Sequence, residues 1–150
     1  MATDEALRLW SALVAVYQPV LRDVVAVLER DAGIDSGTYS ALAYLDQAGG
    51  RMRLRELQDL MRVRYSQPGL SRLVQRMDDD GIVERRVDPD DGRGTVVSLT
   101  RAGRSRFRRA HDVYTTALGE HLGANLPAAA ATALARSLEE LAAGLPARQY

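Results

Sequence analysis

Residues 66–76 hold side chains that can hydrogen-bond to the edges of DNA bases. Apolar residues recur there at helical spacing, at Leu70, Leu73, Val74 and Met77. If that stripe is buried, Arg72 and Gln75 must point away from it, because they lie on the opposite side of the helix. Arginine can grip guanine and glutamine can pair with adenine in the major groove. The same pattern also fits an ordinary solvated helix face.

A loop at residues 88–94 adds a second candidate contact. The β-branched segments 82–87 and 95–99 on either side of it predict two strands of a hairpin. Arg93 lies near the tip between two glycines, where it can enter a minor groove, and Asp91 can pair with that arginine and fix its aim. By itself this loop also fits an ordinary surface turn. The succession of helix, Gly81, strand, basic tip and strand indicates DNA binding more specifically than the helix face or the loop alone.

The charge distribution points to the same middle segment. The net charge is zero and every one of the 20 cationic side chains is arginine. Residues 51–109 hold 15 arginines against 9 acidic residues, whereas the segments before and after them are acidic. Arginine suits bidentate contacts to phosphate and guanine, so the pattern is typical of a local polyanion site, although a solvated arginine-rich surface has the same charge.

Other classes of function find little support. The two histidines, His111 and His121, are ten residues apart and do not share a helix face, and no nucleophile triad, phosphate-binding glycine loop or metal-ligand spacing occurs. We interpret Asp78–Asp80 as a solvated helix end. With no cysteine, disulfides, thiolate metal sites and thiol switches are excluded. We therefore expect no enzyme activity, no cofactor and no metal.

The N-terminus is acidic and polar, unlike a signal peptide, and no uninterrupted apolar run reaches the length of a membrane span. We expect a cytoplasmic protein.

Periodicity and capping residues predict six helices around the hairpin. They are expected at about 4–30 (with a kink or break near 16–18 caused by Pro19), from 35 or 36 to the glycines at 49–50, and at 54–61, 66–80, 100–122 and 127–144. Residues 51–53 form a short extended segment. The predicted fold class is mainly α with a small β-hairpin (α+β).

Residues 66–104 resemble the winged helix-turn-helix core of the MarR family of transcriptional regulators. The residues at that family's spacing are Ser66-Gln67, Ser71-Arg72-Leu73-Val74, Arg76, Gly81, Val83-Glu84-Arg85-Arg86, Asp88-Pro89, Asp91, Arg93, Leu99-Thr100 and Ala102-Gly103. The helix order matches along almost the whole chain. The resemblance implies a single domain, 1–150, in which 34–100 form the DNA-binding lobe and 1–33 and 101–150 are dimerisation helices. It also implies a homodimer bound to a pseudo-palindromic operator in double-stranded DNA, as a repressor.

Carried onto this chain, the resemblance and the helix face predict a set of DNA-contacting residues: Arg64, Ser66, Gln67, Gly69, Ser71, Arg72, Gln75, Arg76, Arg86, Asp91 and Arg93. Many relatives are released from DNA by a small aromatic or phenolic effector. The candidate effector-binding residues are Trp10, Tyr17, Tyr39, His111 and Tyr114, which equally fit a core or a dimer interface.

The chain departs from the family pattern at three places. The turn Arg62–Tyr65 is longer than the commonest family spacing, Arg53 and Arg55 stand where a Ser or Thr helix cap is usual, and Gly92 stands where the wing often has arginine. The alternative function is an architectural or protein-interaction winged-helix module without operator specificity. Apolar residues at positions 71, 72 and 75 would favour that alternative, and this chain has Ser, Arg and Gln there.

Overall fold

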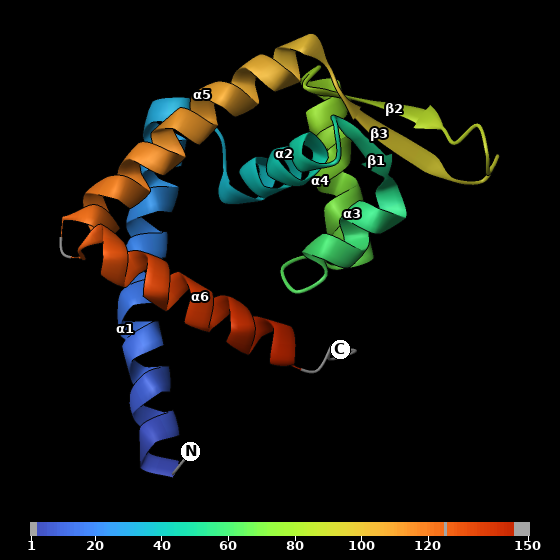
Figure 1. Ribbon diagram of the computed structural model, residues 1–150. Coiled ribbons are helices and arrows are strands. Elements are labelled where there is room, and N and C mark those ends of the chain that lie inside the picture. Colours follow the sequence, from blue (N-terminus) through green and yellow to red (C-terminus); the bar gives the residue numbers. More distant parts are fainter. Residues whose placement is uncertain (1–2, 125, 146–150) are drawn as a thin grey trace.

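The computed structural model describes residues 3–124 and 126–145. Its elements in chain order are α1 (Thr3–Val27), a π-helical turn η1 (Leu28–Ala32), α2 (Ser36–Gln47), β1 (Arg51–Arg53), α3 (Leu54–Met61), α4 (Gln67–Asp79), β2 (Val83–Val87), β3 (Thr95–Leu99), α5 (Arg101–Leu118), a second π-helical turn η2 (Gly119–Gly123) and α6 (Ala128–Gly144). A lobe made of α2, α3, α4 and the sheet lies at one end of α5, and α1 and α6 lie towards the other (Figure 1). The mainly α fold with a β wing is the predicted one.

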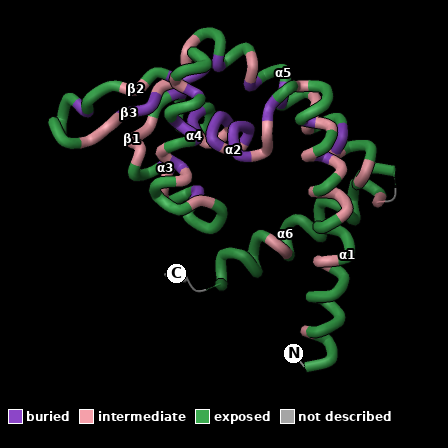
Figure 2. Tube along the Cα trace, turned by 180° about the vertical axis from the view of Figure 1, so that it is seen from behind, coloured by how far each residue is buried: buried purple, intermediate pink, exposed green. Residues whose placement is uncertain are grey.

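The lobe holds most of the buried core, which is built from the apolar stripes read in the sequence. Leu70, Leu73, Val74 and Met77 of α4 are all buried, as predicted. They pack with Leu42 and Leu45 of α2 and with Leu57 of α3 in one hydrophobic cluster. Buried segments gather in this lobe, whereas most of α1 and α6 is exposed (Figure 2). Burying one face of α4 leaves its opposite face to solvent.

The predicted hairpin gains a third strand. The strand order is β1-β3-β2 and both pairings are antiparallel, with Val83 opposite Leu99 and Val87 opposite Thr95. β1 pairs along the other edge of β3, with Arg53 opposite Val96. The sequence predicts the extended segment but not its partner, because three residues are too few to carry a period-two pattern. The β2–β3 hairpin projects away from the helices (Figure 1).

The predicted helix caps at three positions are confirmed. The Asp35 carboxylate accepts from the backbone N–H groups of Gly37 and Thr38, the Ser66 hydroxyl accepts from Gly69, and the Thr100 hydroxyl accepts from Gly103. These bonds satisfy donors that the first turn of a helix leaves free. Each cap therefore fixes where α2, α4 and α5 begin.

The junction between the hairpin and α5 is tightly packed. A Cβ added at Gly103 would lie only 1.9 Å from the Ile82 carbonyl oxygen, so α5 begins directly against the start of the wing. The Thr100 hydroxyl also donates to the Gly81 carbonyl at 2.7 Å. Gly81 itself has φ +68 and ends α4 as predicted.

The first helix runs on past Pro19 without a break. Of the two outcomes expected there, the break is therefore wrong and the kink stays a prediction. Proline removes its own N–H donor and crowds the carbonyl four residues earlier, but the helical turns on either side continue. The helical path continues through η1 and ends at Gly33, which adopts a left-handed φ of 64. The fifth helix is likewise extended by η2.

The two terminal helices are poorly covered. Val24 is the one buried residue of α1, and α6 has none. The segment Thr3–Ala32 is also long and apolar enough to match a membrane span, with a mean hydropathy of 1.5 over an 18-residue window that is 11% buried. One such helix is weak evidence for a membrane span, because core helices of soluble proteins and signal sequences meet the same criteria of length and composition.

Candidate nucleic-acid interface

The face of α4 opposite the core is open to solvent. Gln67, Arg72, Gln75 and Arg76 are exposed, and Gly69 and Ser71 are half-buried. Ser66 caps the helix and Pro68 lies in its first turn, so the N-terminus of α4 is well defined. Arg72 makes no hydrogen bond or ion pair within residues 3–124 and 126–145. Its guanidinium is thus free to approach a base.

Gln75 is held by its neighbours. Its carbonyl oxygen accepts from Nη1 of Arg85 on β2, and its amide nitrogen donates to Oδ1 of Asp79 at 2.8 Å. The predicted adenine-reading amide is therefore already paired on both sides. A base contact by Gln75 requires one of these bonds to open.

Two predicted arginines at the edge of the helix-turn-helix contact the start of α2. Arg76 lies 3.8 Å from Oδ2 of Asp35, and Nη2 of Arg64 donates to the Ser36 hydroxyl at 3.0 Å. Partial burial opposes ionisation of Asp35, yet hydrogen bonds from Thr38 and Gly37 and the charge of Arg76 lower its pKa below the ordinary value. Both cations stay exposed, so these contacts orient them without removing them from solvent.

The long turn before α4 also packs on α2. A Cβ added at Gly37 would collide with the hydroxyl of Tyr65, 1.8 Å away. The absence of a side chain at Gly37 thus makes room for the tyrosine that ends the turn Arg62–Tyr65. The turn is anchored at its Tyr65 end, whereas Val63 in its middle is 85% exposed.

The wing tip differs in one detail from the prediction. The Asp91 carboxylate accepts from the backbone N–H of Arg93 at 3.2 Å and does not bind the guanidinium. Asp91 therefore fixes the backbone of the tip, and the Arg93 side chain makes no ion pair within the described part of the chain. Arg86 on β2 lies farther from the tip, where its Nη2 donates to Glu84 at 2.8 Å.

Two arginines outside the predicted set of DNA-contacting residues join the wing to the helices. Arg85 reaches Gln75, and Arg53 binds Asp88 at 2.6 Å. Arg53 and Asp88 are 35 residues apart, and no local pattern signals such a pair. The only sequence feature that pointed to this pair was the arginine at the cap position of α3, where a Ser or Thr is usual.

Three of the five candidate effector residues form one cluster between α2 and α5. The rings of Tyr39 and Tyr114 stack with centroids 4.5 Å apart, and the Tyr39 hydroxyl lies 3.0 Å from Nδ1 of His111. Burial, together with the nearby Tyr114, raises the pKa of Tyr39 to about 12. A cleft of about 700 Å³ opens beside this cluster, and Phe107 also lines it.

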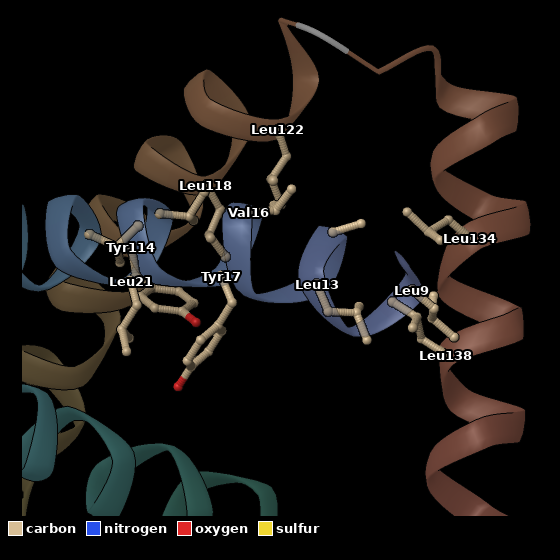
Figure 3. A pocket seen from close by; sticks show the side chains of 13 residues that line it. Leu9, Leu13, Val16, Tyr17, Leu21, Tyr114, Leu118, Leu122, Leu134 and Leu138 are labelled. Atoms are coloured by element: carbon tan, nitrogen blue, oxygen red, sulfur yellow. The ribbon is translucent and has the colours of Figure 1, made fainter. Parts of the chain in front are cut away.

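Tyr17 and Trp10 lie elsewhere. Tyr17 lines a separate apolar groove of about 460 Å³, in which leucines of α1, α5, η2 and α6 face one another (Figure 3). Trp10 is 65% exposed on α1 and lines neither the cleft nor the groove. Tyr114 lines both.

Comparison with known proteins agrees with this arrangement. A family model described as "MarR family" matches residues 32–94, which hold α2 to β2 and the wing loop. The MarR-family regulator Sco3205 from Streptomyces coelicolor, solved in complex with DNA, superimposes with a TM-score of 0.81 and 25% identity, covering 97% of this chain and 91% of that one. Residues 32–94 of the chain thus match the MarR family, and the fold around them is that of MarR-like DNA-binding transcriptional regulators, a class of proteins that are not enzymes.

Two other MarR-like structures extend the comparison. AbsC, a MarR-family regulator from the same organism, matches with a TM-score of 0.81 and 23% identity over 99% of both chains. The organohalide-sensing regulator RdhR-CbdbA1625, in its 2,4-dichlorophenol-bound form, matches with a TM-score of 0.74 and 20% identity over 94% of this chain and 80% of that one. No curated protein matches this sequence.

Proposed function

We propose that this chain is a cytoplasmic repressor that binds a pseudo-palindromic operator as a homodimer. In this proposal residues 34–100 form the DNA-binding lobe, and 1–33 and 101–150 join the two copies. The DNA contacts are those predicted on α4, in the turn before it and on the wing. A small aromatic effector weakens the complex.

The observation that carries the proposal is a pair of arginines, Arg72 on the outward face of α4 and Arg93 near the wing tip, whose guanidinium groups have no partner among the described residues. Arg72 has base-reading chemistry on a helix that can enter the major groove. Arg93 lies on a projecting hairpin, the kind of shape that a minor groove can accept. A DNA complex of the similar regulator Sco3205 supports the same use of this fold.

The homodimer is supported by what the terminal helices leave uncovered. Leu9, Val16 and Tyr17 of α1 and Leu134 and Leu141 of α6 are all exposed. Contiguous apolar surface of this kind is costly in water and marks an interaction site. A second copy supplies the matching surface, since a two-fold interface uses one patch on both subunits.

Selection of bound duplexes from a random pool tests operator binding. The expected product is an inverted repeat whose half-sites are about one helical turn apart, because two recognition helices of one dimer must reach the same face of the DNA. Recovery of unrelated sequences with equal affinity would instead support the architectural alternative.

For the effector we propose the cleft between α2 and α5. It lies between a helix of the lobe and a helix of the dimerisation unit, so a ligand there can change their relative position. Its wall combines stacked aromatic rings with the Tyr39 hydroxyl and His111, which suits a phenol. The dichlorophenol complex of RdhR-CbdbA1625 supports this ligand class.

The cleft is tested with 2,4-dichlorophenol as the probe. Calorimetry is expected to detect binding, and the probe is expected to lower affinity for the selected DNA. The variant Ala43→Phe, which fills the cleft, should lose both responses, while Tyr17→Phe, on the separate groove, should keep them. An unchanged response in Ala43→Phe would place the ligand elsewhere, and no response in the unmodified protein would remove simple phenols from the proposal.

A further inference from the structure

Arg53 connects the first helix of the helix-turn-helix to the base of the wing. It ends β1 and comes directly before α3. Its Nε donates to Oδ2 of Asp88 at 2.6 Å, and its Nη2 lies 3.6 Å from Oδ2 of Asp90. Because the strand order is β1-β3-β2, this contact joins the end of β1 to the loop that follows β2, past the central strand.

The wing loop folds around the Asp88 carboxylate. Asp88 is 3% exposed, and its Oδ1 accepts from the backbone N–H of Asp90 at 3.0 Å. The hydrogen bond from Asp90 and the Arg53 guanidinium hold the pKa of Asp88 below its ordinary value. The backbone N–H of Asp88 donates to the Gly94 carbonyl at 2.9 Å and closes the loop.

The other end of Arg53 is fixed as well. Its backbone N–H donates to Oε2 of Glu56 in the first turn of α3, at 3.1 Å. The arginine is thereby held by its backbone to the helix and by its guanidinium to the wing. Without that guanidinium, the nearly buried Asp88 would lose its cation, which favours rearrangement of the loop.

We propose that Arg53 is a positioning residue for DNA binding, which holds the wing at the angle at which Arg93 meets the DNA. This inference rests on the proposed function, because it assumes that the wing tip contacts the operator. Arg53 itself needs no DNA contact in this role.

Arg51→Ala is the matched control. Arg51 lies on the same strand, is exposed, and makes no ion pair within the described residues. Each variant removes one positive charge, so a purely electrostatic role predicts equal losses. Positioning predicts that Arg53→Ala weakens operator affinity about tenfold and Arg51→Ala about twofold.

The decisive measurement is a double-mutant cycle with Arg93→Ala. If Arg53 acts through the wing tip, Arg53→Ala and Arg51→Ala should have the same small effect once Arg93 is gone. Equal losses in the unmodified background, or a tenfold loss that persists without Arg93, would overturn the positioning role.

Amide hydrogen exchange without DNA separates this inference from the proposed function. Arg53→Ala and the near-isosteric Asp88→Asn should both speed exchange at residues 90–94, while Arg51→Ala should not. Asp88→Asn retains an amide oxygen for the Asp90 bond, and so keeps the test usable if Arg53→Ala fails to fold. Unchanged exchange in Asp88→Asn would overturn the inference that the Arg53–Asp88 pair holds the wing loop in place. A wild-type protein that shows no operator preference would overturn the proposed function and the DNA-positioning role with it.

Discussion

Gln75 on α4 accepts a hydrogen bond from Arg85 on β2, so the recognition helix and the wing share a polar contact. The other side of the same amide is bound to Asp79. A glutamine held in this way has a fixed direction but limited freedom to bind a base. The neighbouring Arg72, with no such partner among the described residues, is the better base reader.

Arg72→Ala is expected to cost about 1–3 kcal/mol on the selected operator and to relax preference at one base position. Gln75→Ala should have a smaller effect on sequence preference, because its amide is already paired within the protein. Binding of both variants to the operator and to its single-base variants measures this difference. A larger loss of preference in Gln75→Ala would show that its bonds to Arg85 and Asp79 open on DNA.

Arg93→Ala is expected to weaken binding and to reduce the slope of log affinity against log salt by about one unit, because one phosphate-neutralising cation is lost. Binding isotherms over a range of salt concentrations give the slope. Arg136→Ala on α6 is the control, since it removes an exposed arginine that is not among the proposed DNA contacts. If the two variants share the wild-type slope, the wing tip does not contact DNA.

Leu134→Asp is expected to convert a dimer into monomers. Leu134 is 48% exposed within one copy, so a charge there leaves the isolated fold intact but must be desolvated in the proposed interface. Sedimentation at micromolar concentration measures the state, and affinity for the full operator should fall with it. Val63→Asp, at an even more exposed apolar position on the turn before α4, should remain dimeric. A monomeric wild-type protein would contradict the proposed assembly.

Asp35→Ala is expected to destabilise the protein by about 1 kcal/mol at pH 7, because the cap of α2 is lost. The pKa of Asp35 is lowered in the folded state. Its stabilisation is therefore complete above the ordinary aspartate pKa and disappears as pH falls through the lower, folded value.

The difference from wild type in urea unfolding should consequently shrink between pH 7 and pH 3. Asp59→Ala, which removes an exposed carboxylate from the last turn of α3, provides the control. A difference that stays constant over this range would mean that the carboxylate charge contributes nothing to the cap.

Much of the lobe follows from local signals. The stripe from Leu70 to Met77 predicts both the buried and the open face of α4, and Ser66 and Gly81 predict its ends. The hairpin follows from two β-branched segments and the turn residues between them. These features depend on neighbours within a few residues, so periodicity and capping rules can find them.

The contacts that orient the site do not follow from such rules. The bonds Arg53–Asp88 and Arg85–Gln75 join different elements and exist only once the sheet has packed beside α3 and α4. The pairing of β1 with β3 has the same origin. The break expected near Pro19 is wrong because the local cost of a proline does not outweigh the helical turns on both sides.

Tyr114 forms part of the wall of both the α2–α5 cleft and the groove between the terminal helices. A molecule that moves this ring from the cleft side alters the surface on which a second subunit is proposed to rest. Ligand affinity and subunit affinity are then reciprocally linked, since each binding event changes the free energy of the other by the same amount. The apparent strength of an effector will accordingly depend on the concentration of the protein itself.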